Sequence, residues 1–183
     1  SQKQVEELSI TPGKPIKPML AQLSEGIEES VKEIGDVIVE TKYDGIRIQI
    51  HHTGGVTKLF TRRLENVTEA LPEIVDYVNE AMPDCDFIIE GEIIATRNNK
   101  PISFQHILQR VKRKYDIEDM KKKVPLKLFV FDILYYKEAT LMLPLLKRRS
   151  LLEDVIKTSD VVELSSMRHV KGDEYKDAEE LFR

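Results

Sequence analysis

The alternation of apolar and polar residues predicts a chain built largely from short strands joined by tight turns. Residues 37–50 read VIVETKYDGIRIQI, and isoleucines and valines recur at every second position on both sides of Asp44-Gly45. A period of two is typical of half-buried strands, and Asp-Gly is a frequent hairpin turn. The pattern therefore predicts strands over about 37–42 and 45–52, paired through this turn. Further strands are predicted at 56–61 after the turn Thr53-Gly54-Gly55, at 86–96, at 126–136 and at 161–164.

Apolar residues at helical spacing predict helices between these strands. Ser24, Thr68 and Ser103 are each placed to cap a first helical turn, and Gly35 is placed to end a helix. The predicted helices cover about 25–34, 69–81, the stretch after Ser103, about 144–157 and a last stretch that opens near Asp173. Because hairpin connections outnumber strand–helix–strand crossovers, we expect an α+β fold of largely antiparallel sheets with helices packed outside them.

Composition places the chain among globular proteins that bury a core. It has 183 residues, 41% of them hydrophobic and 33% charged. The single cysteine, Cys85, excludes an internal disulfide and a cysteine-based metal cluster. No apolar run approaches the length of a membrane span, so we expect an intracellular protein without a membrane partner.

Charge is unevenly distributed along the chain. The net charge is −4, yet residues 97–127 carry ten Lys or Arg against three Asp or Glu, which is +7 and leaves −11 elsewhere. This basic segment is either a phosphate-facing surface or a solvated helix face beside acidic neighbours.

Lys42 is the first residue whose placement suggests chemistry. In an extended chain Glu40, Lys42 and Asp44 project to one side, with Arg47 just beyond the turn. A lysine between carboxylates is ordinarily an ion pair, but an arginine nearby is suited to a phosphate or a ribose hydroxyl. The stretch is therefore either a surface ion pair or part of a nucleotide site in which the lysine amine is a nucleophile.

Two carboxylates interrupt the isoleucine run IIEGEII. Glu90 and Glu92 lie two residues apart and so share one face of the predicted strand. A buried carboxylate without a partner is costly, so each needs a cation, a hydroxyl or an arginine beside it. A structural salt bridge and a ligand-binding role remain open for this pair.

Arginines and aromatic residues supply the other parts of a nucleotide site. Arg62 and Arg63 follow a strand directly, and Phe129, Phe131 and Ile133 recur with a period of two. Such aromatic residues form either core or a plate on which a base stacks. The sequence has no glycine-rich phosphate loop, which argues against a P-loop kinase or a dinucleotide-binding fold.

These stretches resemble one known family. ETKYDGIR (40–47) resembles the Lys-x-Asp-Gly-x-Arg signature of covalent nucleotidyltransferases, in which the lysine takes a nucleotide as a phosphoramidate. FTRRLENVTEALPEI (60–74), EGEI (90–93) and FVFDILYY (129–136) follow in the order of that superfamily. With GKPIKPMLAQ upstream and LKRRSLLE downstream, the chain is most similar to ATP-dependent DNA ligases of the archaeal and eukaryotic replicative type.

The resemblance implies a fold of two mainly antiparallel sheets with flanking helices and a nucleotide cleft between them. It implies residues 1–18 as a linker from an N-terminal DNA-binding domain, and 19–183 as an adenylation domain whose last motifs lie beyond 183. The implied cofactors are ATP and Mg²⁺. The implied partners are nicked duplex DNA, sealed during replication, repair and recombination, and a sliding clamp bound through other regions.

The resemblance also assigns roles to six residues. Lys42 would be the nucleophile that takes AMP, and Glu92 would bind the ribose and a metal ion. The other assigned contacts to the nucleotide are Glu40 with the adenine, Arg47 with the ribose or phosphate, Arg62 with a phosphate, and Phe131 stacked on the adenine.

Two alternatives remain at this point. An RNA ligase or a GTP-using mRNA capping enzyme would share the block around Lys42. A non-catalytic DNA-binding fragment would instead act through the basic segment at 97–127.

Overall fold

The computed structural model describes residues 10–97, 100–111 and 117–171, which fall into two units. The larger unit comprises Ser1–Lys17 and Tyr43–Leu164, and the smaller unit comprises Pro18–Lys42 and Ser165–Arg183. Each unit is described by itself. The predicted helix near Asp173 and the turn residues 98–99 lie outside the described residues.

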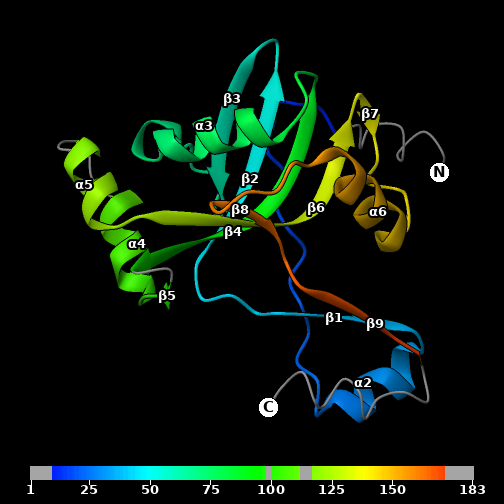
Figure 1. Ribbon diagram of the computed structural model, residues 1–183. Coiled ribbons are helices and arrows are strands. Elements are labelled where there is room, and N and C mark those ends of the chain that lie inside the picture. The colour runs from blue at the N-terminus through cyan, green and yellow to red at the C-terminus, as the bar shows by residue number, and fades with distance from the viewer. Residues whose placement is uncertain (1–9, 98–99, 112–116, 172–183) are drawn as a thin grey trace. The chain divides into compact units, whose positions relative to one another are not determined.

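A seven-stranded sheet forms the centre of the larger unit (Figure 1). Its main path runs β3-β2-β4-β6-β7, while β5 pairs with β4 and β8 pairs with β6. Every pair is antiparallel except β6 with β8, which confirms the largely antiparallel prediction. The strands are β2 (Ile46–Thr53), β3 (Val56–Thr61), β4 (Phe87–Arg97), β5 (Lys100–Pro101), β6 (Leu126–Tyr136), β7 (Glu138–Ala139) and β8 (Val162–Leu164).

The hairpin between β2 and β3 has the predicted turn. Gly54 and Gly55 have φ angles of 58° and 75°, a left-handed backbone that other residues rarely adopt. Two consecutive residues with positive φ are typical of a type I′ turn, whose twist matches that of the flanking strands.

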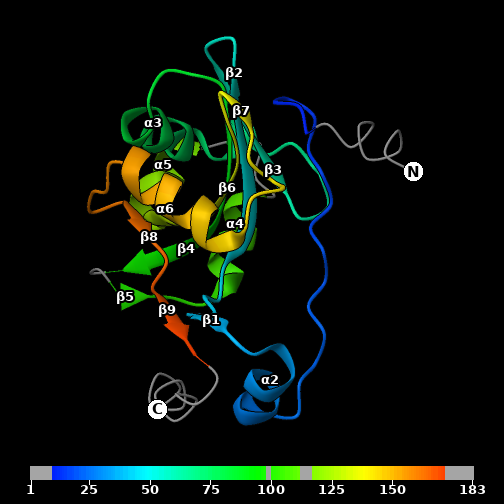
Figure 2. The same cartoon turned by 90° about the vertical axis from the view of Figure 1, so that its right-hand side faces the viewer.

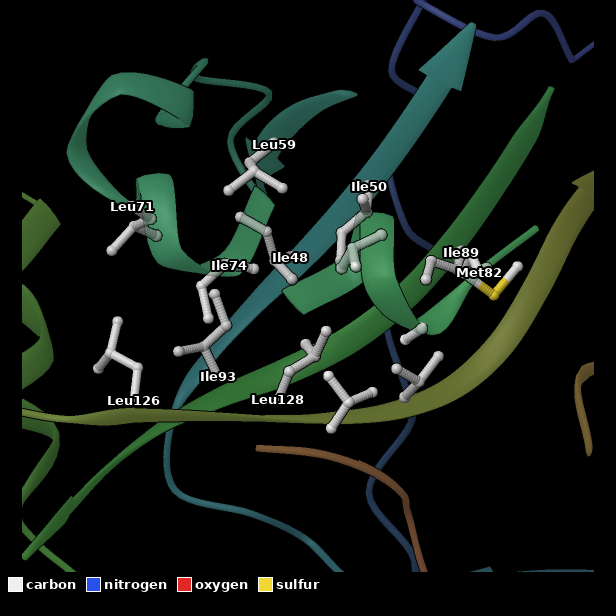
Figure 3. Packing of buried hydrophobic residues seen from close by; sticks show 14 of the residues in the cluster. Ile48, Ile50, Leu59, Leu71, Ile74, Met82, Ile89, Ile93, Leu126 and Leu128 are labelled. Atoms are coloured by element: carbon white, nitrogen blue, oxygen red, sulfur yellow. The ribbon is translucent and has the colours of Figure 1, made fainter. Parts of the chain in front are cut away.

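The helices of the larger unit pack on one face of this sheet. Their apolar sides meet Ile48 and Ile50 of β2, Ile89 of β4 and Leu128 of β6, all of which are fully buried (Figure 3). Because strand residues alternate between faces, the polar residues between these positions lie on the opposite face. The helices are α3 (Pro72–Ala81), α4 (Phe104–Val111), α5 (Ile117–Lys123) and α6 (Leu145–Val155), with a 3-10 turn at Thr68–Ala70 before α3.

Two predicted helix caps are confirmed and two are wrong. The Ser103 hydroxyl accepts the backbone N–H of Gln105, which caps α4, and Gly35 ends the first helix with φ 86°. Thr68 does not cap α3, because Pro72 begins that helix and the Thr68 hydroxyl accepts the N–H of Leu59 instead.

The smaller unit contains one helix and a two-stranded sheet. Strand β1 (Val37–Glu40) pairs antiparallel with β9 (Met167–Val170), and the helix is α2 (Ile27–Ile34). Ser24, predicted to cap this helix, lies two residues too early. The N-cap is Gly26, whose N–H is accepted by the Ser24 hydroxyl in the turn before the helix.

The predicted hairpin between residues 37–42 and 45–52 is therefore wrong. The first of these strands pairs with β9, and the second pairs with β3 and β4. Both edges of β2 are occupied, one by β4 from Ile46 onward and the other by β3 from Ile48 onward, so residues 37–42 do not pair with it. None of the helices among the described residues has the length and apolar character needed to cross a membrane.

Candidate functional site

A row of polar side chains lies on the face of the large sheet that the helices leave uncovered. Arg47, Gln49 and His51 alternate along β2, and Glu92 and Glu90 of β4 stand opposite Arg47 and Gln49 in the strand register. The intervening residues of both strands are core isoleucines and Gly91. We call this set of five residues the polar face.

The buried carboxylate of Glu90 has an arginine, one of the three kinds of partner that the sequence predicted for it. Arg47 donates from Nη2 to Glu90 Oε2 over 2.5 Å, and the Glu90 side chain is 6% exposed against 35% for Arg47. The guanidinium carbon of Arg47 also lies 5.2 Å from the centroid of the Phe131 ring. Arg47 is therefore held between a carboxylate and an aromatic ring while a third of its side chain remains accessible.

Gln49 and His51 extend this network. Gln49 Nε2 donates to Glu90 Oε1 over 2.9 Å, and His51 Nε2 lies 2.8 Å from Gln49 Oε1. Burial lowers the pKa of His51 to about 4, so the imidazole is neutral near pH 7. Its Nδ1 accepts the backbone N–H of Gly13, which leaves the ring proton on Nε2 to be donated to Gln49.

A β-bulge in β6 separates Ile133 from Phe129 and Phe131, with which it was predicted to share one side of the strand. Val130 stands opposite Gly91 and Asp132 opposite Glu90, so Phe131 is an extra residue in the strand. The bulge ends the alternation that placed Phe129, Phe131 and Ile133 on one side. Ile133 is in the core, whereas Phe131 lies beside Arg47.

Besides the contact of Arg47 with Phe131, the larger unit has an aromatic stack at Phe129. The Phe129 ring stacks on Tyr43 with centroids 4.1 Å apart and planes inclined by 19°. Lys127 lies 5.6 Å from the same ring and forms an ion pair with Glu163. Tyr43 comes directly after Lys42, so this stack fixes the first residue of the larger unit after the chain leaves the smaller one.

Arg148 of α6 binds Asp132 through two nitrogens. Nε and Nη2 lie 2.7 and 2.8 Å from the two carboxylate oxygens, and Nη1 donates to the Leu143 carbonyl over 2.6 Å. Hydrogen bonding to Asp132 raises the pKa of Arg148. This pair neutralises the carboxylate that stands opposite Glu90, so α6 supports the β6 side of the polar face.

Gly45 of the Lys-x-Asp-Gly-x-Arg block has no room for a side chain. A Cβ at this position would lie 2.2 Å from the carbonyl oxygen of Ile93 and 3.0 Å from Cγ of Glu92. The glycine therefore allows the chain to pass closely over β4 just before Arg47 enters β2.

The six predicted site residues are divided between the two units. Arg47, Glu92 and Phe131 lie in the larger unit around the polar face, and Arg62 is exposed at the end of β3. Glu40 and Lys42 belong to the smaller unit, where Glu40 ends β1 and its Oε1 lies 3.5 Å from the Ser165 hydroxyl. A single site formed by all six stays a prediction, as does the cleft between the sheets.

Sequence reasoning missed three residues of this part of the larger unit, namely Gln49, His51 and Tyr43. Gln49 and His51 share the strand parity of Arg47, and this polar alternation is the signal that would have found them. Tyr43 had no comparable signal, because its stack on Phe129 depends on tertiary structure.

The basic segment at 97–127 is not uniformly a surface. Arg110 is 2% exposed and paired with Glu73 of α3, so it contributes to the interior. Burial raises the pKa of Glu73 and lowers that of Arg110, and their mutual attraction opposes both shifts. Lys122 and Lys123 on α5 are exposed, and residues 112–116 lie outside the described part of the chain.

Comparison with known proteins identifies the family. A model of the ATP-dependent DNA ligase domain matches residues 18–183. The chain is 65% identical over 178 residues to a DNA ligase of Methanosphaera stadtmanae and 53% identical over 179 residues to one of Methanobrevibacter smithii. These alignments cover 97% of this chain and 32% of each relative, so the chain spans about a third of their length.

Solved structures share the fold at low sequence identity. Mycobacterial DNA ligase D complexed with ATP and MES matches with a TM-score of 0.59 and 19% identity, covering 90% of this chain and 50% of that one. An archaeal ATP-dependent RNA ligase matches with a TM-score of 0.54 and 17% identity, covering 90% and 41%. The fold is therefore common to DNA and RNA ligases, whereas the family match and the relatives above are DNA ligases.

Proposed function

Because this chain belongs to the family of ATP-dependent DNA ligase domains, we propose that it takes AMP from ATP onto Lys42. The observation that carries the proposal is the family match over residues 18–183, which includes the whole block from Lys42 to Arg47. The polar face supports it, because it offers a partly exposed arginine beside an aromatic ring and a carboxylate.

The proposed reaction exchanges one bond at the α-phosphate of ATP for another. The neutral amine of Lys42 attacks the α-phosphorus, a P–N bond forms, the bond to the bridging oxygen of the β-phosphate breaks, and pyrophosphate leaves. The lysine nitrogen loses its proton to solvent or to the leaving group. Little covalent chemistry is asked of the protein, so its contribution is positioning and charge neutralisation.

Nucleotide contacts are proposed for four further residues. Arg47, on the polar face, would contact the ribose or the α-phosphate, and Arg62 would contact a phosphate. Phe131 would stack on the adenine, and Glu40 would recognise its edge. Because one side of the Phe131 ring has Arg47 within 5.2 Å, we propose that the base uses the other side.

Mg²⁺ is proposed to bind through Glu92 together with the phosphates of ATP. Within residues 10–97, 100–111 and 117–171, no three His, Cys, Asp or Glu side chains gather into a metal site. One carboxylate on the polar face fits Mg²⁺ nonetheless, because this ion is commonly held by one or two carboxylates plus substrate phosphates. When bound, the ion would neutralise charge on the phosphates.

The later steps of ligation are proposed for the protein at the full length of its relatives. AMP would pass from Lys42 to the 5′-phosphate at a nick in duplex DNA, and the 3′-hydroxyl would then displace AMP. Roles in replication and repair, a sliding-clamp partner and an intracellular location belong to the same proposal. We expect residues 1–183 alone not to seal a nick, because they span 32% of the relatives.

Labelling with radioactive nucleotides tests the proposal. The full-length protein incubated with Mg²⁺ and α-labelled ATP should become covalently labelled, and GTP should label it far less. Lys42→Arg should abolish labelling although the charge is kept, because a guanidinium does not lose its proton to become a nucleophile. Preferred labelling by GTP would favour a capping enzyme, and undiminished labelling of Lys42→Arg would exclude Lys42 as the nucleophile.

A further inference from the structure

Residues 10–17 pack against the polar face although they form no helix or strand. Ile10 is 6% exposed and forms a small apolar cluster with Ile88 and Leu134. This cluster is separate from the main core, and Figure 2 shows the dark-blue segment on the side of the sheet away from α3. The segment lies before residue 18, where the family match begins.

Backbone groups of the segment bind two side chains of the polar face. Gly13 donates its N–H to His51 Nδ1 over 3.0 Å, and Ile16 donates its N–H to Gln49 Oε1 over 2.9 Å. Gln49 Nε2 lies 3.3 Å from the Ile16 carbonyl oxygen and so donates back to the same residue. A backbone N–H can only donate, which fixes both the His51 tautomer and the orientation of the Gln49 amide.

The same side chains lead to Arg47. With its oxygen occupied by Ile16 and His51, Gln49 turns its amide nitrogen toward Glu90 Oε1. This hydrogen bond occupies one carboxylate oxygen and leaves Oε2 for Arg47 Nη2. The donors and acceptors thus form one directed path from the backbone at 13–16 to the guanidinium.

We propose that the segment 10–17, acting through Gln49 and Glu90, positions Arg47 for the nucleotide. The inference rests on the proposed function in one respect, namely that Arg47 contacts ATP. Without the Gln49 amide, Glu90 Oε1 would be a buried oxygen in need of a donor. Arg47 would then turn to bind both carboxylate oxygens, a geometry that guanidinium and carboxylate groups favour, and would be drawn away from its place over Phe131.

Gln49 is a positioning residue in this scheme and does not touch the substrate. The ATP dissociation constant should rise about tenfold in Gln49→Leu, the factor expected for one lost hydrogen bond. Ile10→Ala should also raise the ATP dissociation constant, although it leaves every polar group of the path in place. Val78→Ala, which removes buried atoms from α3 on the opposite face of the sheet, is the matched control and should leave the affinity unchanged.

Hydrogen exchange supplies a second readout that a merely structural role would not change. If docking of the segment strengthens ATP binding, then ATP must strengthen docking by the same factor. In the full-length protein, ATP should slow amide exchange in the peptide that contains Gly13 and Ile16. Gln49→Leu should remove this effect, while Val78→Ala should retain it.

The outcomes separate this inference from the proposed function. If wild-type protein binds ATP and becomes labelled, but Gln49→Leu and Ile10→Ala bind ATP as tightly as wild type, the positioning role is overturned and the proposed function stands. If Val78→Ala weakened ATP binding as much as Ile10→Ala does, the positioning role would also be overturned, because ATP affinity would then merely follow the stability of the fold. If wild-type protein fails to bind ATP, both are overturned. Should Gln49→Leu not fold, Ile10→Ala decides the question.

Discussion

Acidification should destabilise the larger unit through one buried histidine. His51 is 1% exposed, its Nδ1 accepts the Gly13 N–H and its Nε2 donates to Gln49. Protonation of Nδ1 would set its new N–H against the N–H of Gly13. Because two donors cannot form a hydrogen bond with each other, the folded state disfavours the protonated imidazole. In the strand register Lys58 of β3 stands opposite His51, and Gln49 links His51 to the Glu90–Arg47 pair.

The size of the effect follows from the lowered pKa. Burial lowers the His51 pKa from 6.5 to about 4. Since the folded pKa is the lower one, its contribution to stability is complete above pH 6.5 and is lost as the pH falls toward 4. A difference of about 2.5 pH units at about 1.4 kcal/mol per unit gives roughly 3 kcal/mol.

Chemical denaturation at a series of pH values measures this contribution. Wild-type protein should lose about 3 kcal/mol more than His51→Asn between pH 6.5 and 4, because asparagine can accept the Gly13 N–H but does not titrate. Subtracting the two curves cancels other groups that titrate independently. If the free energy of unfolding fell equally with pH in the two proteins across this range, the assignment of a buried neutral His51 would be refuted.

Three further predictions concern stability and DNA binding. Gly45→Ala should lower the free energy of unfolding by about 2–3 kcal/mol, because the new Cβ meets the Ile93 carbonyl. An unchanged free energy in chemical denaturation would contradict this steric conflict. Glu73→Gln should lower the free energy of unfolding by about 3–5 kcal/mol, because it leaves Arg110 charged and buried, and equal stability of variant and wild type would contradict the ion pair. Replacing Lys121–Lys123 by Ala in the full-length protein should reduce the slope of log DNA affinity against log salt by about 2–3. An unchanged slope would indicate that these lysines do not contact DNA.

Strand alternation predicted most of the larger unit because each strand there has one apolar face. The β2–β3 hairpin, β4 and β6 formed at the predicted positions, since positive-φ glycines and isoleucine runs encode them locally. The partner of residues 37–40 could not be predicted, because it lies at 167–170 and nothing local marks that pairing. Asp44-Gly45 looked like a hairpin turn, but its glycine instead serves a close approach to β4.

As with the fold, part of the candidate site was predictable from the sequence and part of it was not. Burial energetics alone predicted that Glu90 needs a cation, a hydroxyl or an arginine beside it, and in the structure Arg47 is that partner. The bulge at Phe131 could not be foreseen, because one extra residue in β6 changes which side chains share a face without any local sequence mark. The role of 10–17 was hidden for a different reason: its hydrogen bonds come from backbone groups, which every sequence supplies.

Mass spectrometry of the adenylated protein tests the central claim most directly. The full-length protein is incubated with ATP and Mg²⁺, digested, and the modified peptide is sequenced. The account predicts AMP on Lys42, through a phosphoramidate that is lost in acid and survives in base. AMP on another lysine, or no adduct in a protein that binds ATP, would contradict it.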